Sequence, residues 1–289
     1  MAVDTTEKFV TLGHPSYVWR RGQERRLNLV RSYVTLENQR ILDVGCGLGT
    51  YVRRLREFSE HVWGTDIDPE KASAAAAHLP HIVQGAAESL PFRPDSFDVV
   101  LLNEVLEHVH DDRETIIEAV RCVHPGGHVV VFAPNRLYPF ETHGFFIGRR
   151  YYFRLLPLIN YTPDLIRNIF CHHVRIYTGR GLARLFDGLP VDFVVRSHIY
   201  PGLDNIAARH RSLGRLLHSA VDVAEKTPLR ALGISHFVVA RKREVGVPAN
   251  VVGRTETMTG SGSNPGIHTA NARIAATRSI VALGHASGL

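Results

Sequence analysis

The stretch "ILDVGCGLGT", residues 41–50, constrains the fold of this chain more than any other segment. A short apolar run that contains one acidic residue, Asp43, is followed by glycine at every second position: Gly45, Gly47 and Gly49. Glycine tolerates positive φ angles and lets other groups approach the backbone closely. The pattern therefore predicts a buried strand that ends in a loop whose backbone is open to close contact, and the question is what makes that contact.

Apolar, β-rich runs recur along the chain with helix-forming segments between them. The first five runs, which are nearly continuously apolar as expected of parallel strands covered on both faces, are residues 40–45, 61–66, 81–85, 97–102 and 128–133. Helical spacing of apolar residues appears between them at 51–58, 69–78 and 111–123. Two later runs, 191–199 and 235–242, are expected to complete the sheet as an antiparallel pair around a helical stretch at 203–226. We therefore predict an α/β fold with a Rossmann-like, doubly wound, seven-stranded and mostly parallel sheet.

The same patterns predict how the chain is divided. Residues 1–39 are expected to form an N-terminal helical cap, because Leu27, Val30 and Val34 lie on one apolar stripe. The α/β domain spans residues 40–243 and contains a long aromatic excursion at about 134–177. Long excursions in compact domains are usually functional, so we expect a lid inserted after the fifth strand. Residues 244–289 lose all periodicity and are predicted to be a disordered tail.

Composition narrows the setting in which the protein works. The 289 residues are 44% hydrophobic and 21% charged, which is typical of a soluble globular protein. Three cysteines without CxxC spacing fit a reducing cytoplasm. The N-terminus lacks the features of a secretory signal, and no run approaches the roughly 18 apolar residues of a membrane span. We therefore expect a cytoplasmic protein, with peripheral membrane contact as an additional expectation and no prediction of oligomeric state.

The glycine loop also indicates the charge of its ligand. A dinucleotide-binding loop of the type GxGxxG would require glycine at position 50, which is Thr50. In addition, Asp43 at the end of the strand would repel a pyrophosphate and attract an ammonium or sulfonium group. These two residues disfavour a nicotinamide oxidoreductase and point to S-adenosylmethionine.

Four motifs in consecutive order connect the chain to a known family. They are "LDVGCGLG", "GTDIDPE", "ESLPFRPDSFDVVLLNEVLEHV" and "RCVHPGGHVVVFAPN", all between residues 40 and 134. Together they resemble the core of class I S-adenosylmethionine-dependent methyltransferases of domain type 11, particularly the quinone-biosynthesis O- and C-methyltransferases. The resemblance implies an enzyme that transfers a methyl group to a small-molecule or lipid-like acceptor, with oxygen as the expected acceptor atom.

The resemblance also implies which residues bind the cofactor. Gly45, Cys46, Gly47 and Gly49 would hold its methionine part, with Asp43 near the amine and the Asn103 backbone at the same end. Asp66 would accept the ribose hydroxyls, and Ile67 would pack on the adenine. Many relatives have "GDAE" where this chain has "GAAE", residues 85–88. This departure moves recognition of the adenine amino group to the backbone near Ala87 or to Glu88.

Two histidines are candidates for the general base that a neutral hydroxyl acceptor requires. His108 follows the fourth predicted strand, and His143 lies in the expected lid. The alternatives are a structural role for His108, whose "LEHV" context recurs in relatives with different chemistries, and simple solvent exposure for His143.

A metal site is a further hypothesis. Glu104, Glu107 and His108 are spaced i, i+3 and i+4, which places them on one face of a helical turn. The "EVLEH" pattern resembles one proposed to bind a divalent ion in quinone O-methyltransferases. The interpretation that we favour from the sequence is a partly buried turn with paired charges, so no metal ligand is assigned.

The segment 135–161 mixes aromatic residues with Arg149, Arg150 and Arg154. It is expected either to cover an apolar acceptor and contact an anionic or lipid headgroup, or to be a cap whose arginines are simply solvated. Two alternative functions stay open. One is an RNA methyltransferase, which the net charge of +6 favours. This chain, however, lacks the motifs for methylating base amines or cytosine C5. The other is a non-catalytic partner protein that binds S-adenosylmethionine.

Overall fold

The structure is a computed structural model that describes residues 19, 21–202 and 211–244. Most of the first half of the predicted N-terminal cap, part of the predicted helical stretch at 203–226 and nearly all of the predicted tail lie outside the described residues.

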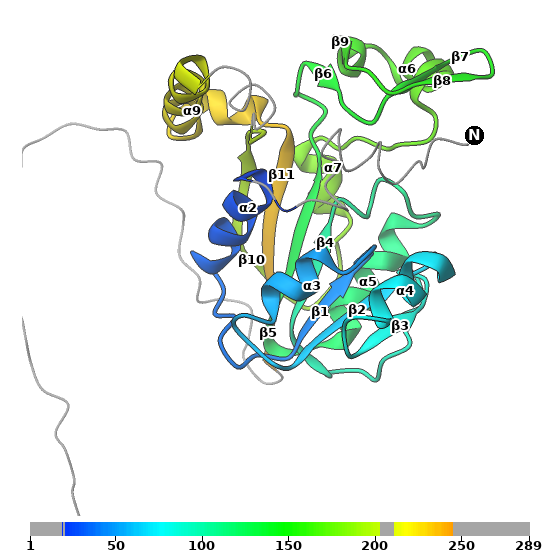
Figure 1. Cartoon of the computed structure of the whole chain (residues 1–289), viewed down its shortest axis with the longest axis vertical. Coiled ribbons are helices and arrows are strands. Elements are labelled where there is room, and N and C mark those ends of the chain that lie inside the picture. Colours follow the sequence, from blue (N-terminus) through cyan, green and yellow to red (C-terminus); the bar gives the residue numbers. More distant parts are fainter. Residues whose placement is uncertain (1–18, 20, 203–210, 245–289) are drawn as a thin grey trace, which may run out of the picture. The chain divides into compact units, whose positions relative to one another are not determined.

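A seven-stranded sheet forms the framework (Figure 1). Its strand order is β10-β11-β5-β4-β1-β2-β3, with β1 to β5 parallel and β11 antiparallel to both of its neighbours. The strands are β1 (Ile41–Val44), β2 (Val62–Asp66), β3 (Ile82–Gln84), β4 (Phe97–Asn103), β5 (Val123–Pro134), β10 (Val191–Ile199) and β11 (Ser235–Lys242). The predicted Rossmann-like sheet and its final antiparallel pair are confirmed.

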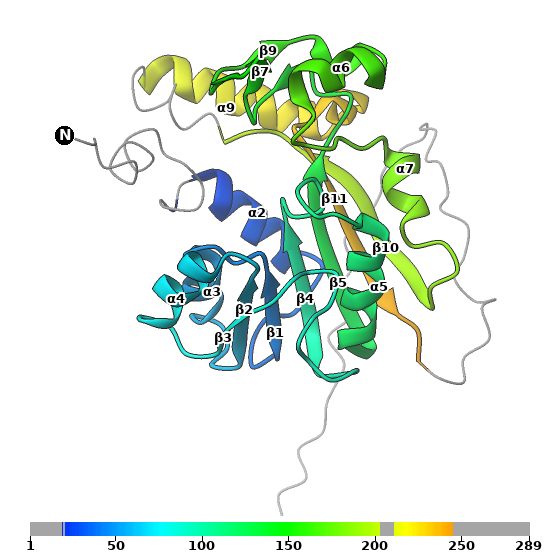
Figure 2. The same ribbon diagram turned by 90° about the vertical axis from the view of Figure 1, so that its right-hand side faces the viewer.

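Helices pack on both faces of this sheet (Figure 2). On one face, Leu27 of α2 and Val52 of α3 join a cluster with Val130 and Phe132 of β5. Side chains of α5 and α7 pack with Val131 in a second cluster on the other face. Because successive side chains of a strand point to opposite faces, burial on both sides requires the continuous apolar runs seen in the sequence. The helices are α2 (Arg21–Arg31), α3 (Thr50–Leu55), α4 (Pro69–Ala76), α5 (Asp112–Cys122), α7 (Gly179–Arg184) and α9 (Arg211–Glu225).

Side-chain caps fix where two of these helices begin. The Asp68 side chain accepts hydrogen bonds from the backbone N–H groups of Glu70 and Lys71, and Pro69 occupies the first turn of α4. The Asp111 side chain accepts the N–H of Glu114 at the start of α5. Both caps lie just beyond the carboxyl ends of strands, so they also fix the loops that lead from the sheet into these helices.

An insertion, residues 134–177, separates β5 from α7. An isolated bridge between Asn135 and Tyr177 joins its two ends. In Figures 1 and 2 its short elements form one group beyond the end of β5. They are β6 (Phe140–Glu141), β7 (Phe145–Ile147), β8 (Arg150–Tyr152), β9 (Leu156–Pro157), the 3-10 helix η1 (Ile159–Tyr161) and α6 (Asp164–Cys171).

The N-terminal helix packs as its apolar stripe predicts. Leu27, Val30 and Val34 are all buried, with relative exposures of 4% or less. None of the helices in the described part of the chain is both long enough and apolar enough to cross a membrane.

Candidate functional site

Three polar residues stand at the carboxyl ends of neighbouring parallel strands. Asp43 lies in β1, Asp66 ends β2 and Asn103 ends β4. Strand β1 pairs with β2 on one side and with β4 on the other, so the chain reverses its winding direction here. Ligands of open α/β sheets bind at this kind of switch point. The sheet therefore places three of the expected cofactor-binding residues along one edge.

The glycine loop follows β1 with three left-handed residues. The φ angles of Gly45, Gly47 and Gly49 are 68°, 55° and 78°. A Cβ atom on Gly45 would lie 2.6 Å from Cγ2 of Val105, and one on Gly49 would lie 2.3 Å from Cδ1 of Leu79. The missing side chains at Gly45 and Gly49 thus leave room for Val105 and Leu79. At Gly45, this space lets the loop after β4 pack closely against the glycine loop.

Asp66 joins its strand to the glycine loop. One carboxylate oxygen accepts the N–H of Gly47 at 2.8 Å, and the other accepts the N–H of Asp68 at 2.9 Å. A carboxylate oxygen has more than one acceptor site, so these bonds leave room for ligand hydroxyl groups. The side chain is therefore held in place with acceptor capacity remaining.

Asp43 is buried, and no hydrogen bond or ion pair joins its carboxyl group to the side chains of other described residues. Burial, together with the nearby Asp66 carboxylate, raises the pKa of Asp43 to about 8. A cation at this position would restore the ionised form. The buried Asp43 carboxyl group thus fits a ligand that carries an ammonium or sulfonium group, as S-adenosylmethionine does. Burial also raises the pKa of the Cys46 thiol, which keeps it protonated and unreactive.

The remaining expected cofactor residues differ in their availability. Ile67 is 61% exposed and is open to a planar ligand group, whereas Ala87 is buried. Glu88 accepts the backbone N–H of His110 at 2.7 Å, so its carboxylate already holds the loop before α5. The side-chain oxygen of Asn103 accepts a hydrogen bond of 2.8 Å from Arg26. Among these four residues, the geometry leaves Ile67 the most accessible side chain.

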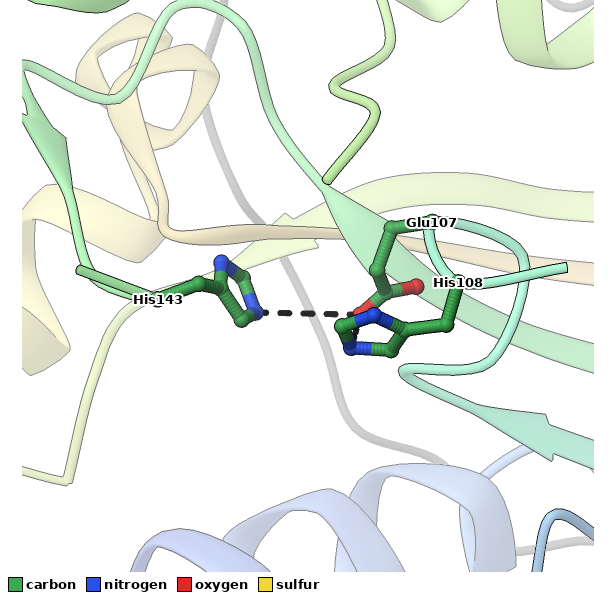
Figure 3. Close-up of side chains that lie close together, drawn as sticks. All are labelled: Glu107, His108 and His143. Carbon is green, nitrogen blue, oxygen red and sulfur yellow. Dashed lines mark ion pairs between the residues drawn. The ribbon is translucent and has the colours of Figure 1, made fainter. Parts of the chain in front are cut away.

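The two candidate bases meet on either side of a buried carboxyl group (Figure 3). Nε2 of His143, from the insertion, lies 3.8 Å from Oε1 of Glu107, and Nε2 of His108 lies 3.9 Å from the same atom. The two imidazole rings are edge to face, with centroids 5.7 Å apart. Residues 35 positions apart in the sequence thus form one cluster, which we call the Glu107–His108–His143 cluster.

Glu107 is the unusual member of this cluster. Its side chain has no exposed surface, and its carboxyl oxygens accept no hydrogen bond from N–H or O–H groups of the described residues, although the Glu104 carboxylate lies within hydrogen-bonding reach. Burial and the neighbouring Glu104 carboxylate raise the pKa of Glu107 well above its usual range. Burial also lowers the pKa of His108 to about 4, with His143 adding to the effect. Because the raised pKa keeps Glu107 protonated, its O–H group is a donor for the ionised Glu104 carboxylate, which leaves the other carboxyl oxygen facing the two histidines.

The cluster has the chemistry of a metal site as well as of a base. One ligand atom from each of Glu107, His108 and His143 lies within 4.8 Å of the others. Carboxylate and imidazole ligands suit several divalent ions. This set differs from the Glu104, Glu107 and His108 set considered from the sequence, because His143 takes the place of Glu104.

Comparisons with known proteins agree with this geometry. Residues 42–131 match the family described as "Methyltransferase domain". The chain contains a class I S-adenosylmethionine-dependent methyltransferase domain. This confirms the family expected from the four sequence motifs and S-adenosylmethionine as the cofactor of the domain.

Curated relatives resemble the methyltransferase domain but not the whole chain. The ubiquinone biosynthesis O-methyltransferase of Xylella fastidiosa (strain M23) is 32% identical over 140 residues, which cover 46% of this chain and 56% of the relative. The enzyme of the same name from Stutzerimonas stutzeri is 32% identical over 142 residues, covering 46% and 60%. The chain thus spans little more than half the length of these relatives.

Solved structures share the fold of the methyltransferase domain. An S-adenosylmethionine-dependent methyltransferase from Mesorhizobium loti has a TM-score of 0.50 at 21% identity and covers 74% of this chain and 96% of its own. The [4+2]-cyclase SpnF has a TM-score of 0.51 at 20% identity, covering 78% and 83%. A methyltransferase and a cyclase therefore share this architecture, so the activity must be argued from the site.

Sequence reasoning missed one residue that shapes the site of the methyltransferase domain. Arg26 of α2 forms an ion pair of 2.7 Å with Glu104 and donates a hydrogen bond of 2.8 Å to Oγ of Ser235. Although burial opposes ionisation, the Arg26 charge helps to lower the pKa of Glu104 to about 2. Arg26 therefore helps to keep Glu104 ionised next to Glu107. The helical spacing could have identified Arg26, because it precedes Val30 by four residues and so lies on the buried face of the helix.

Proposed function

We propose that this protein transfers a methyl group from S-adenosylmethionine to a hydroxyl oxygen of a small-molecule or lipid-like acceptor. The observation that carries the proposal is the meeting of His143 with Glu107 beside the loop that packs on Gly45. It provides an imidazole close to the expected cofactor loop. The names of the ubiquinone biosynthesis O-methyltransferases support oxygen as the acceptor atom.

S-adenosylmethionine supplies an electrophilic methyl group on a sulfonium. The acceptor hydroxyl forms the new C–O bond as the C–S bond breaks, and its proton must leave to a base. We assign this base to Nε2 of His143. His108, whose pKa of about 4 makes it a weak proton acceptor, contacts the acceptor beside it. Neutral Glu107 avoids placing a second negative charge next to the developing oxyanion.

Labelled methyl transfer tests this proposal. The purified chain is incubated with methyl-labelled S-adenosylmethionine and cell extract, and the label is followed into lipid, small-molecule and nucleic-acid fractions. We expect label in one of the first two fractions, and a loss of roughly 10²-fold or more in rate for His143→Gln. Label in RNA alone would identify a nucleic-acid methyltransferase instead. Binding of S-adenosylmethionine without any transfer would identify a non-catalytic partner protein.

A bound divalent ion is a second candidate role for the same cluster. It is favoured by Glu107, His108 and His143, each of which offers one ligand atom within 4.8 Å of the others. Metal-free protein titrated with Mg²⁺ or Zn²⁺ in a calorimeter tests this role. Binding that Glu107→Gln abolishes, together with activity lost in EDTA and restored by the ion, would support it. Full activity in EDTA would refute the metal role and leave the general base as the only proposed role of the cluster.

We further propose that the insertion makes peripheral contact with an anionic membrane surface. Large apolar side chains are exposed across it, among them Ile147, Phe153 and Leu158 at 56%, 50% and 61%. Exposed Arg149, Arg150 and Arg154 lie between them in the sequence. None of the three forms an ion pair with an acidic residue in the described ranges. Apolar residues interleaved with unpaired cations are typical of surfaces that bind lipid headgroups.

Co-sedimentation with lipid vesicles tests this contact. We expect the chain to bind vesicles that contain phosphatidylglycerol and to release as salt is raised, because the attraction is screened. Replacing Arg149, Arg150 and Arg154 by glutamine should weaken binding, whereas Arg184→Gln, in α7 outside the insertion, serves as the control. Equal binding to neutral and anionic vesicles would contradict the electrostatic part of the proposal.

A further inference from the structure

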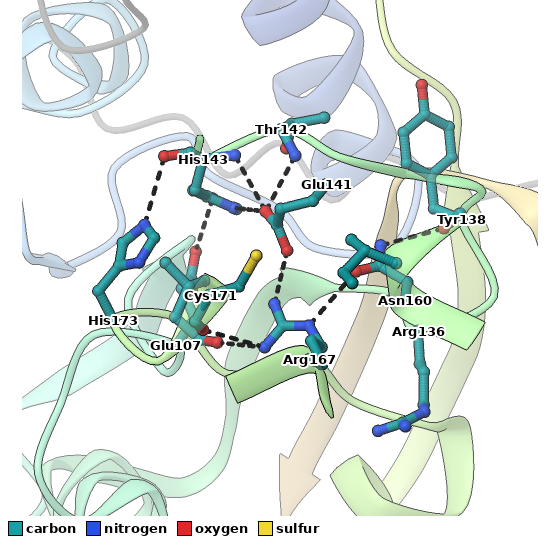
Figure 4. A network of polar contacts seen from close by, with 12 residues as sticks. Glu107, Arg136, Tyr138, Glu141, Thr142, His143, Asn160, Arg167, Cys171 and His173 are labelled. Atoms are coloured by element: carbon teal, nitrogen blue, oxygen red, sulfur yellow. Dashed lines mark hydrogen bonds and ion pairs between the residues drawn. The ribbon is translucent and has the colours of Figure 1, made fainter. Parts of the chain in front are cut away.

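The carboxylate of Glu141, in β6 of the insertion, is almost completely enclosed by donors (Figure 4). Its Oε1 atom accepts the backbone N–H of Thr142 at 2.9 Å and that of His143 at 3.0 Å. The same atom lies 2.9 Å from Nδ1 of the His143 ring. One carboxylate oxygen thus fixes both the backbone and the side chain of the proposed base.

Arg167 of α6 holds the other oxygen of this carboxylate. Its Nη2 atom lies 2.5 Å from Oε2 of Glu141, and both side chains are 2% exposed. Its Nη1 atom donates to the carbonyl oxygens of Val174 at 2.7 Å and Cys171 at 3.3 Å, and its Nε atom donates to the side-chain oxygen of Asn160 at 3.4 Å. Arg167 is therefore tied to the end of α6, and through it the position of Glu141 depends on the folded insertion.

The charge state of Glu141 determines which nitrogen of His143 carries the proton. One oxygen of the Glu141 carboxylate accepts two backbone N–H groups and the other accepts the Arg167 guanidinium, and these donors favour its ionised form. An ionised carboxylate only accepts hydrogen bonds. Nδ1 of a neutral His143 must then be the donor, which leaves the lone pair on Nε2, the atom that lies 3.8 Å from Glu107.

We propose that Glu141 is a positioning residue that holds His143 in the Nδ1-protonated tautomer with its basic Nε2 atom facing the reaction site, and that Arg167 fixes Glu141 for this task. This inference rests on the proposed methyl transfer, in which His143 removes the acceptor proton. The hydrogen bond from a neighbouring acceptor decides the tautomer and orientation of an imidazole. The insertion thereby supplies both the base and the residues that orient it.

The tautomer can be measured without any turnover. The full chain is labelled with ¹⁵N-histidine, and long-range ¹H–¹⁵N spectra are recorded at alkaline pH, where imidazoles are neutral. His143→Gln identifies the His143 signals by their loss. We expect a single tautomer protonated at Nδ1. Protonation at Nε2, or a mixture of the two tautomers, would overturn the proposal even if the protein methylates an acceptor.

Substitution of Glu141 provides the second arm. In Glu141→Gln, an amide oxygen that accepts from Arg167 turns the NH₂ group to Nδ1 of His143, which favours protonation at Nε2, and leaves the backbone N–H groups of Thr142 and His143 without this acceptor. We expect the tautomer to reverse and kcat to fall on the order of 10²-fold, with the KM for S-adenosylmethionine changed less than about two-fold. Asp164→Asn is the control, because it removes an ion pair with Arg136 in the same insertion that does not touch His143.

The outcomes separate this inference from the proposed function. An unchanged tautomer and an unchanged kcat in Glu141→Gln would refute the positioning role. If Glu141→Gln does not fold, the tautomer of the wild-type chain still decides. The wild-type protein could also show Nδ1-protonated His143 but methylate no acceptor. That result would refute the proposed methyl transfer and leave the role of Glu141 in orienting the ring intact.

Discussion

Among single residues, Asp43 and Glu107 share an unusual property, since each is a buried carboxyl group whose pKa is raised. Burial is the first cause of the raised pKa in both, and a neighbouring acid is the second. Both groups therefore store an unfavourable electrostatic interaction that a suitable ligand can relieve. Such groups concentrate at functional sites.

For Asp43, this predicts a pH-dependent affinity for the cofactor. Binding a cationic amine requires the ionised carboxylate, so the protein must release a proton below its pKa of about 8. The affinity for S-adenosylhomocysteine should rise by up to about ten-fold per pH unit below this value and level off above it. Calorimetry at several pH values measures this slope. Asp43→Asn should bind weakly and without the slope, whereas parallel curves for the two proteins would count against Asp43 as the partner of the amine.

For Glu107, the raised pKa predicts a loss of stability as pH rises. The unfolded chain ionises this group from about pH 4.5, while the folded chain keeps it protonated to a much higher pH. The folded state therefore loses relative stability as pH rises above that point. Glu107→Gln should gain in unfolding temperature over the wild type as pH increases. Glu118→Gln is the control, because the hydrogen bond from Arg121 outweighs burial and lowers the pKa of Glu118. This variant should therefore lose unfolding temperature relative to the wild type as pH increases. An equal response of both variants would refute the raised pKa of Glu107.

Among the structural elements, α2 is the one whose position depends most on a polar anchor. Arg26 reaches from this helix to residues at the ends of β4 and β11, and its guanidinium lies 4.9 Å from the centre of the Phe132 ring. The apolar stripe explains why α2 packs on the sheet. The Arg26 contacts explain why it packs beside the site.

Removing this anchor should destabilise the domain measurably. In Arg26→Ala the Glu104 carboxylate loses its partner, with 25% of its side chain exposed. We expect a loss of on the order of 2 kcal/mol in the free energy of unfolding, less than the roughly 3–5 kcal/mol typical of fully buried pairs. Urea denaturation measures it. The matched control is Arg31→Ala on the same helix. The side chains of Arg31 and its ion-pair partner Glu37 are 41% and 53% exposed, so this pair should contribute less than about 1 kcal/mol. Equal losses in the two variants would contradict the role of Arg26 as an anchor.

The elements also show how far the sequence alone leads. Periodicity predicted the seven strands of the sheet, because burial on both faces of β1, β4 and β5 leaves a continuous apolar run. The glycine loop predicted the position of the site. The pairing of His143 with Glu107 and the role of Arg167 were not predicted, because they depend on how the insertion folds back, and no local pattern encodes a contact across 36 residues. From the sequence, His143 was only a candidate base in an expected lid, and Arg167 was not singled out.

For the whole molecule, the cofactor should raise thermal stability, since a ligand that binds only the folded state stabilises it by mass action. S-adenosylhomocysteine at about 100 times its Kd should add about 2.7 kcal/mol, which corresponds to a rise of roughly 5–10 °C in Tm for a domain of this size. Differential scanning calorimetry measures the shift. Asp66→Ala, which loses the acceptor of the Gly47 and Asp68 N–H groups, should unfold at a lower temperature without ligand. It should also lose most of the ligand-induced shift, and a full shift in this variant would exclude Asp66 from the cofactor site.

The bridge between Asn135 and Tyr177 has a consequence for how such proteins diversify. The insertion leaves the sheet and returns to it at adjacent backbone positions, so a replacement of different length or sequence can be spliced between the same two residues without shifting a strand. The cofactor half of the reaction would be inherited unchanged, while the half that chooses the acceptor would be exchanged as a cassette. Chimaeras that trade residues 136–176 between relatives are therefore a direct route to new acceptor specificities.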